Sequence, residues 1–111
     1  MTTTPEGRVA AALRQAVIEA GGEIRKLRWE GRNGAPDYFV ILRGKVWLIE
    51  CKAPGKRPRA SQMLEFERLS QAGINVLVID NAAHARGLVE LLTTRGCFAE
   101  FAFQRYRKKC D

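Results

Sequence analysis

Residues 34–52, GAPDYFVILRGKVWLIECK, contain two apolar runs with the composition of buried strands, and Asp37, Glu50 and Lys52 lie next to these runs. Asp37 precedes one apolar run, whereas Glu50 and Lys52 follow the next. Strands this apolar are usually covered on both faces of a sheet. Buried carboxylates and amines are rare unless they are paired or bind a metal ion. These three residues are therefore the first candidates for a functional site.

The pattern predicts two strands, at about 37–43 and 46–52, that form a hairpin. Gly44 suits the first central position of a two-residue type II′ turn, which would pair Arg43 with Val46. Directly opposed residues of an antiparallel pair share a face of the sheet. This register therefore brings the charges together on one face, whereas a shift by one residue would separate them.

In that register Asp37 lies opposite Lys52, and Glu50 is diagonal to Asp37 at about 7–8 Å between Cα atoms. Two carboxylates at this spacing can share one hard cation, and a site of oxygen ligands with open positions suits Mg²⁺ or Mn²⁺ rather than Zn²⁺. Such an ion activates a bound water and neutralises charge on a phosphodiester. The alternative is a purely structural ladder of salt bridges, because this pattern of charges is easily met by chance.

Composition favours one domain, 1–111, with a hydrophobic core of its own: 46% of the 111 residues are hydrophobic. We expect neither a membrane-spanning segment nor a signal peptide, because no apolar run is long enough and residues 1–6 show no basic region followed by an apolar one. The three cysteines form no CxxC pair, which argues against a zinc site and favours a reducing, cytoplasmic setting. The single histidine, His84, is expected at the surface of a helix.

A net charge of +7 and a pI of about 9.8 indicate an anionic partner, nucleic acid before membrane. The basic residues are clustered rather than scattered. The candidates for DNA contact are Arg32, Lys56, Arg57, Arg59, Arg105, Arg107, Lys108 and Lys109.

Apolar periodicity predicts seven elements in the order α-β-β-β-α-β-α. They are a helix from Pro5 to the Gly21-Gly22 pair, strands at 23–29, 37–43 and 46–52, a helix at 60–72, a strand at 74–79 and a helix at about 82–94. The third strand, second helix and fourth strand have the length of a right-handed crossover. We therefore expect an α/β fold with a mixed sheet flanked by helices. Residues 97–103 are ambiguous between a last strand and an extended arm.

The motifs resemble a known family. Pro36-Asp37 followed by Glu50-Cys51-Lys52 is similar to the PD-(D/E)XK nucleases. The GAPD stretch, the Glu-x-Lys strand and a glutamine that opens the next helix resemble the virus-type replication-repair nuclease domain, VRR-NUC. The resemblance spans about residues 5–79 and implies a restriction-endonuclease-like fold with a Mg²⁺- or Mn²⁺-dependent nuclease site.

The resemblance also implies a ligand set for the metal. Asp37 and Glu50 would bind it together with the backbone carbonyl of Cys51, whose side chain we expect in the core. The acidic residue of the family's first helix corresponds to Glu6, which would complete the site or support it. By position alone, Glu6 is a first-turn carboxylate that favours the helix dipole, on the apolar stripe of its helix.

Two further side chains would act on water and phosphate in the resembled family, and they correspond to Lys52 and Gln62. One departure concerns Arg59, because family members often have a small capping residue three positions before the glutamine. The departure leaves open the exact start of this helix and the direction of the Gln62 side chain.

The leading hypothesis is a metal-dependent endonuclease that hydrolyses DNA phosphodiester bonds. Small family members resemble phage-encoded homodimers that act on branched DNA such as Holliday junctions, which implies a role in DNA repair inside a bacterium or phage-infected host. Symmetric resolution of a junction needs two sites, which a twofold dimer supplies. The alternatives are a non-catalytic basic module that binds nucleic acid, and a monomeric nuclease acting on flaps or single-stranded ends.

The C-terminal tail gives a prediction of its own. Deleting residues 104–111 is expected to weaken DNA binding and to reduce the slope of log affinity against log salt by roughly one per lost phosphate contact. Deletion from residue 97 is also expected to yield monomers or insoluble protein, because the apolar segment 97–103 is a candidate dimer contact. Anisotropy titrations and sedimentation measure both effects. Unchanged binding and mass in both truncations would leave the tail without either role.

Overall fold

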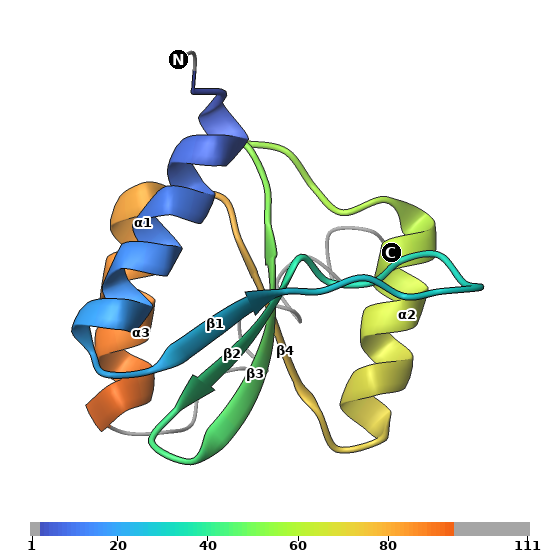
Figure 1. Cartoon of the computed structure of the whole chain (residues 1–111). Helices are drawn as coiled ribbons and strands as arrows, with labels where there is room; N and C mark the ends of the chain where they lie inside the picture. The colour runs from blue at the N-terminus through green and yellow to red at the C-terminus, as the bar shows by residue number, and fades with distance from the viewer. Residues whose placement is uncertain (1–2, 95–111) are drawn as a thin grey trace.

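The computed structural model describes residues 3–94, which form a mixed sheet with helices on both faces (Figure 1). The elements are α1 (Pro5–Glu19), β1 (Glu23–Lys26), β2 (Tyr38–Leu42), β3 (Lys45–Cys51), α2 (Ala60–Gln71), β4 (Asn75–Ile79) and α3 (Ala82–Thr94). This order confirms the predicted α-β-β-β-α-β-α arrangement. The predicted arm at 97–103 and the basic tail lie outside the described residues. No helix within 3–94 is long and apolar enough to cross a membrane.

The four strands lie in the order β1-β2-β3-β4. β1 pairs with β2 and β2 with β3 in antiparallel fashion, whereas β3 and β4 are parallel. The parallel pair is connected through α2, as the crossover expectation required. As a result, β2 begins and β3 and β4 end at the same edge of the sheet.

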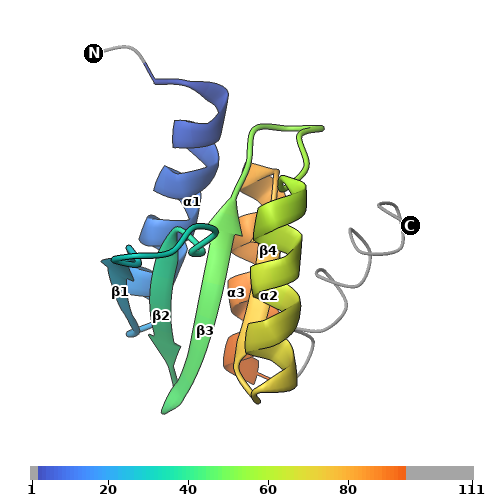
Figure 2. The ribbon, with the colours of Figure 1, turned by 90° about the vertical axis from the view of Figure 1, so that its right-hand side faces the viewer.

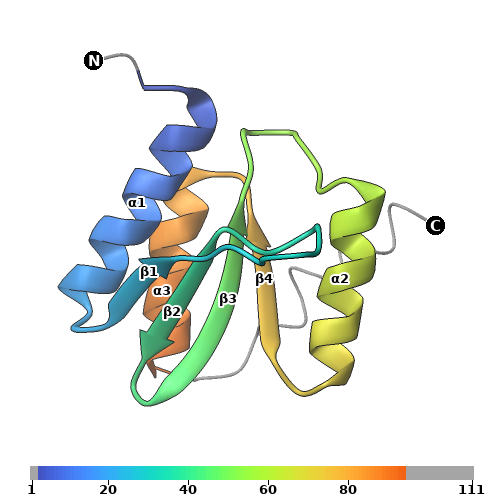
Figure 3. The ribbon, with the colours of Figure 1, turned by 45° about the vertical axis from the view of Figure 1, so that its right-hand side comes forward.

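The larger core lies between the sheet and the helix pair α1 and α3, which stand side by side on one face (Figure 3). Thr4 caps α1 by accepting a hydrogen bond from the Gly7 N–H at 2.9 Å, and Pro5 occupies the first turn. The apolar stripe of α1, including Leu13 and Val17, is fully buried against strand residues such as Trp47. This core fixes α1 along the sheet.

A smaller core covers the opposite face, where α2 is the one helix among the described residues (Figure 2). Met63 and Phe66 of α2 meet Leu48, Val76 and Val78 from β3 and β4. Because one helix covers only part of this face, the long loop between β1 and β2 supplies further apolar cover. The loop therefore belongs to the core as well as to the surface.

The hairpin register differs from the predicted one. β2 and β3 pair Leu42 with Lys45, so that Arg43 and Gly44 are the central residues of the turn. Both have positive φ, 51° and 78°, which is the conformation of a type I′ turn. The type I′ turn matches the twist of the flanking strands, and this outweighs the steric cost of placing an arginine there.

The corrected register changes the partner of the catalytic candidate Asp37. Continuing the pairing by one position beyond Tyr38 and Ile49 places Asp37 opposite Glu50, not opposite Lys52 as predicted. The partner moves by two residues, and side chains alternate with period two, so the charges remain on one face. The predicted grouping of charges is thus confirmed although the predicted register is wrong.

β1 is also shorter than predicted. It ends at Lys26 rather than at residue 29, although the Leu27 N–H still donates to the Asp37 carbonyl at 2.8 Å. Beyond that bond the chain leaves the sheet, because Leu27 and Trp29 pack against the α2 core. This departure starts the long loop that returns at Asp37.

Two glycines make a matched test of the turn. Gly44 has positive φ and Gly87 lies inside α3, and an added Cβ meets nothing within 4 Å at either position. Gly44→Ala should destabilise the fold by about 1–2 kcal/mol, because an L-residue is strained in this conformation. Gly87→Ala should stabilise it by roughly 0.5–1 kcal/mol through helix propensity. Urea unfolding measures both, and destabilisation of equal size in the two variants would contradict the turn geometry.

Candidate metal-binding and catalytic site

The three charged residues of the opening motif meet at one end of the sheet. Asp37 immediately precedes β2, Glu50 lies near the end of β3, and Lys52 follows that strand. Their strand neighbours Phe39 and Leu48 pack with α2, so all three charges belong to the α2 face. Antiparallel pairing of β2 with β3 brings them together without any long loop between them.

Backbone hydrogen bonds fix the position of Asp37. Its Oδ2 accepts from the Cys51 N–H at 3.0 Å, and its own carbonyl accepts from Leu27. The N–H and C=O of one strand residue point toward the same neighbouring strand. The Cys51 carbonyl is therefore directed toward the side where Asp37 lies, which is compatible with its predicted role as a metal ligand.

Glu50, Lys52 and Gln62 form a closed triangle of polar contacts. Glu50 Oε2 accepts from Lys52 Nζ at 2.9 Å and from Gln62 Nε2 at 2.8 Å. Gln62 Oε1 in turn accepts from Lys52 Nζ at 3.1 Å. The ammonium group can only donate, which fixes the amide with its oxygen toward Lys52 and its nitrogen toward Glu50. The predicted grouping of these side chains is therefore present in the structure.

Gln62 is aimed at the site by the start of α2. The helix begins at Ala60 with Arg59 as its N-cap, and the arginine side chain has no acceptor with which to cap the helix. Instead Gln62 Oε1 accepts from the Arg59 N–H at 2.9 Å, as the third residue of a capping box does. The unusual cap therefore does not divert Gln62, which is buried at 6% exposure.

Glu50 carries an incompletely compensated charge. Its side chain is 2% exposed, and Oε1 has no hydrogen-bond partner among the described residues. Burial raises the pKa of Glu50 and the charge of Asp37 raises it further, against the lowering effects of Lys52 and Gln62. An unsatisfied buried acceptor costs about 1–3 kcal/mol, and more if charged.

These observations fit a hard divalent cation. A cation beside Glu50 and Asp37 would satisfy the free carboxylate oxygen and offset the repulsion between the two acids. Within residues 3–94 no three Asp, Glu, His or Cys side chains are grouped closely enough to hold an ion by themselves. The remaining ligands would therefore be the Cys51 carbonyl, waters or substrate oxygens, as is usual for Mg²⁺.

Glu6 lies at the same end of the molecule but not inside the cluster. It is exposed in the first turn of α1, which stands beside the loop that follows β3 (Figures 1 and 3). The expectation that it follows the buried stripe is wrong, because burial on α1 begins only at Val9. Its role as a metal ligand stays a prediction.

The Cys51 side chain has no nucleophilic role in this geometry. It is buried with the core of the α1 face, opposite to Glu50, as predicted. Burial raises the pKa of the Cys51 thiol, and the negative charges of Asp37, Glu50 and Glu6 raise it further. The thiol is therefore protonated and inert.

Sequence analysis missed a second set of contacts that centres on Glu65 of α2. This carboxylate is 5% exposed and accepts from Trp29 Nε1 at 2.8 Å and from Arg32 Nη2 at 2.9 Å. Both partners belong to the loop that ends at Asp37. The signal available in the sequence was one acidic residue on an apolar helix face, three positions after Gln62.

Gly34 explains why the motif begins with glycine. Its φ is 93°, and an added Cβ would lie 3.1 Å from both Glu65 Cβ and the Ser61 carbonyl oxygen. The loop thus passes directly over the first turns of α2, where no side chain fits. Close packing here sets the path of the chain into Asp37.

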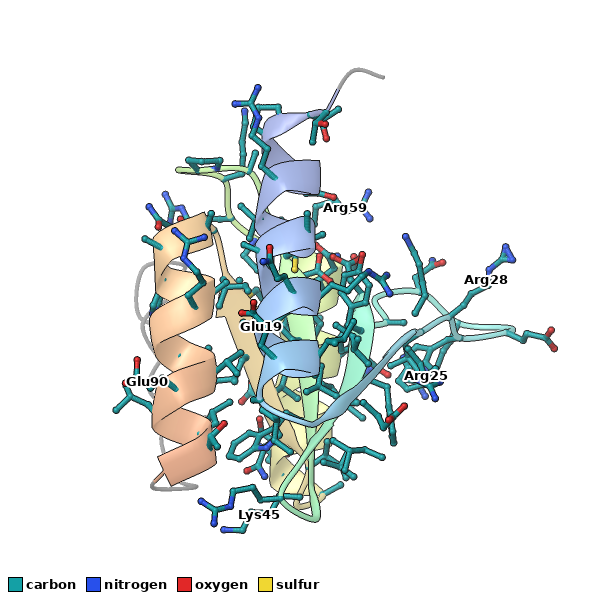
Figure 4. The ribbon with its side chains drawn as sticks, turned by 60° about the vertical axis from the view of Figure 1, so that its left-hand side comes forward. Glu19, Arg25, Arg28, Lys45, Arg59 and Glu90 are labelled. Atoms are coloured by element: carbon teal, nitrogen blue, oxygen red, sulfur yellow. The ribbon has the colours of Figure 1, made fainter. Side chains whose placement is uncertain are left out.

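Four of the eight residues predicted to contact DNA lie within residues 3–94, in two loops near the site. Lys56, Arg57 and Arg59 are exposed in the segment between β3 and α2, and Figure 4 shows Arg59 beyond the upper part of α1. Arg32 is half-exposed while its guanidinium binds Glu65. The four basic residues of the tail, Arg105, Arg107, Lys108 and Lys109, lie outside the described part of the chain. DNA contact by these residues stays a prediction.

Metal binding should change stability in a pH-dependent way. The pKa of Glu50 is higher in the folded state than in the unfolded state. The metal-free fold therefore loses stability as the pH rises from the pKa of the unfolded state, about 4.3, through the pKa of the folded state. Mn²⁺ binds the ionised carboxylate, so its increment in melting temperature should grow over the same window. Glu50→Gln should remove the increment and flatten this part of the profile. Thermal melts with and without millimolar Mn²⁺ test this, and an increment that survives in Glu50→Gln would place the metal elsewhere.

Comparison with known proteins points to one kind of protein. No family model matches the sequence. The chain is 42% identical over 66 residues to "Putative nuclease p44" of Acyrthosiphon pisum secondary endosymbiont phage 1, covering 59% of this chain and 71% of the phage protein. The fold is similar to a solved structure described as "VRR_NUC domain", with a TM-score of 0.73 and 40% sequence identity over 79% of this chain and 97% of that one.

Sequence identity, shared fold and the arrangement of the motif agree. The GAPD stretch, the Glu-x-Lys strand and the glutamine of α2 converge at one end of a restriction-endonuclease-like sheet. The chain is a nuclease domain, and it belongs to the VRR-NUC family.

Proposed function

We propose that this protein is a metal-dependent endonuclease that hydrolyses DNA phosphodiester bonds. The observation that carries the proposal is the buried Glu50 carboxylate, which has one oxygen bound by Lys52 and Gln62 and the other without a partner among residues 3–94. A purely structural salt bridge would not need Asp37 beside it, because a second negative charge raises the cost of burying the first.

Asp37, Glu50 and the Cys51 carbonyl would hold Mg²⁺ or Mn²⁺, and Glu6, whose charge acts on Cys51, would support the site. When bound, the ion supplies an activated water and neutralises charge on the phosphate. The protein's own part is to hold the two carboxylates in place through the Cys51 N–H and through Gln62. Rigid positioning of the reacting groups supplies much of the rate enhancement in phosphoryl transfer.

Lys52 is placed to act on the reacting phosphate. Its side chain is 15% exposed, so the ammonium group is largely withdrawn from solvent but still accessible at the strand end. Bonds to Glu50 and Gln62 restrict its rotation, which leaves one donor for a water or a phosphate oxygen. A fixed cation in a partly desolvated site stabilises charge that develops in the transition state.

The preferred substrate is branched DNA, and the working unit is a homodimer. Support comes from the family resemblance, from the small size of the domain and from its net charge of +7. One site cuts one strand, so paired cuts in a junction need two sites related by a twofold axis.

The first test removes the charge of Asp37. Asp37→Asn should abolish cleavage in Mg²⁺, by at least two orders of magnitude, while DNA binding is retained or improved because a negative charge near the phosphate is lost. Asp80→Asn is the matched control, since this aspartate follows β4 and accepts a hydrogen bond from the exposed Gly55 N–H at 3.4 Å. If Asp37→Asn cleaves DNA at the same rate as the wild type, the proposed metal site is wrong.

A substrate panel tests the finer part of the proposal. Four-way junctions, flaps, duplexes and single strands are incubated with Mg²⁺, Mn²⁺ or Ca²⁺, and the mass of the protein is measured by sedimentation. Paired cuts in junctions by a dimer support the proposal. Cuts at flaps or ends by a monomer, or binding without any cleavage, would each replace it with one of the alternative functions.

A further inference from the structure

Tyr38, the residue after Asp37, is in contact with two cations from different elements. The Arg14 guanidinium of α1 and the Lys26 ammonium of β1 each lie 5.7 Å from the centroid of its ring. Tyr38 itself is buried at 7% exposure in the core of the α1 face. The ring therefore acts as a fixed platform that holds both cations at the rim of the sheet.

The two cations are exposed, and within residues 3–94 neither forms an ion pair. Their neighbours behave differently. Arg25, one position before Lys26, is bound to Glu23 at 2.8 Å, and Arg32 is bound to Glu65. A contact with an aromatic face leaves the N–H donors of a cation able to bind an anion. The Tyr38 pair thus retains its charge and its hydrogen-bonding capacity.

The pair stands close to the catalytic candidates. Lys26 is directly opposite Tyr38 in the β1–β2 ladder, and Tyr38 is bonded to Asp37. Cα spacings of 3.8 Å along a strand and about 4.5–5.5 Å across it place the Cα atoms of Lys26 and Asp37 within about 10 Å. The Lys26 charge also acts on Cys51 together with the charges of Asp37 and Glu50.

The surroundings extend this positive surface away from the site. Beyond Lys26 the chain continues into the loop that carries Arg28, which points outward on the loop side of α1 (Figure 4). Arg28 also lacks an ion pair among the described residues. A polyanion that reaches the metal site from this side would therefore meet Arg28, then Lys26 and Arg14.

We propose that Arg14 and Lys26, held on the ring of Tyr38, form a subsite for a DNA backbone phosphate that flanks the phosphate to be cut. The subsite lies on the α1 side of the sheet, whereas Glu50, Lys52 and Gln62 act from the α2 side. It rests on the proposed DNA-cleaving function and adds to it the side from which the DNA strand enters. Its contacts are to phosphate, so they position the strand without reading sequence.

The subsite predicts a salt-dependent loss of binding. In Arg14→Gln/Lys26→Gln both charges are removed, while the first two methylene groups of each side chain remain. The slope of log affinity against log salt for labelled duplex and junction DNA, in Ca²⁺, should fall by about two. With arginine in place of glutamine at position 26, the contribution of this position to the slope should return, because the charge returns. Arg25→Gln/Lys45→Gln is the control of equal net charge, because Arg25 is paired with Glu23 and Lys45 lies at the far hairpin end of the sheet.

The outcomes separate this inference from the proposed function. A wild-type slope in the double variant, with its fold verified by urea unfolding, overturns the subsite even if Mg²⁺-dependent cleavage is found. An equal fall in slope in the control variant also overturns it, because general charge would then explain the effect. A selective fall without any metal-dependent cleavage in the wild type supports the subsite and contradicts the nuclease site.

Discussion

A buried carboxylate is the constraint around which this structure is arranged. Glu50 lies at 2% exposure at the end of the most apolar strand, and the cost of that burial is met only in part. Lys52 and Gln62 satisfy one oxygen, while the charge of Asp37 adds a repulsion that the described residues compensate only in part. The result is a rigid site with a deficit of positive charge, which is the electrostatic state that a divalent cation would complete.

Helix α2 holds the two halves of this site together. Its residue Gln62 fixes Glu50 from β3, and one turn later Glu65 anchors the loop that leads to Asp37. Gly34 allows that loop to approach the helix backbone. The geometry of the carboxylates is therefore set by side-chain contacts on one helix in addition to the pairing of two strands, and a shift of α2 would disturb both.

Two kinds of basic residue occur in this protein, and composition does not distinguish them. Arg25 and Arg32 are bound to carboxylates, and their charge serves the fold locally. Arg14 and Lys26 instead rest on an aromatic ring, which orients them, and no carboxylate among residues 3–94 pairs with them. Only the second kind strengthens the field that an approaching polyanion experiences.

The sequence by itself determined the order of elements, the mixed sheet and the grouping of Asp37, Glu50 and Lys52, because periodicity and strand alternation are local properties. The face of the sheet predicted for these residues is correct although the predicted turn is wrong, because the register moved by an even number of residues. Only the tertiary structure decided the turn type, the exposed position of Glu6 and the role of Glu65. These depend on twist, on where a helix overhangs the sheet and on contacts across more than thirty residues, for which a local pattern carries no signal.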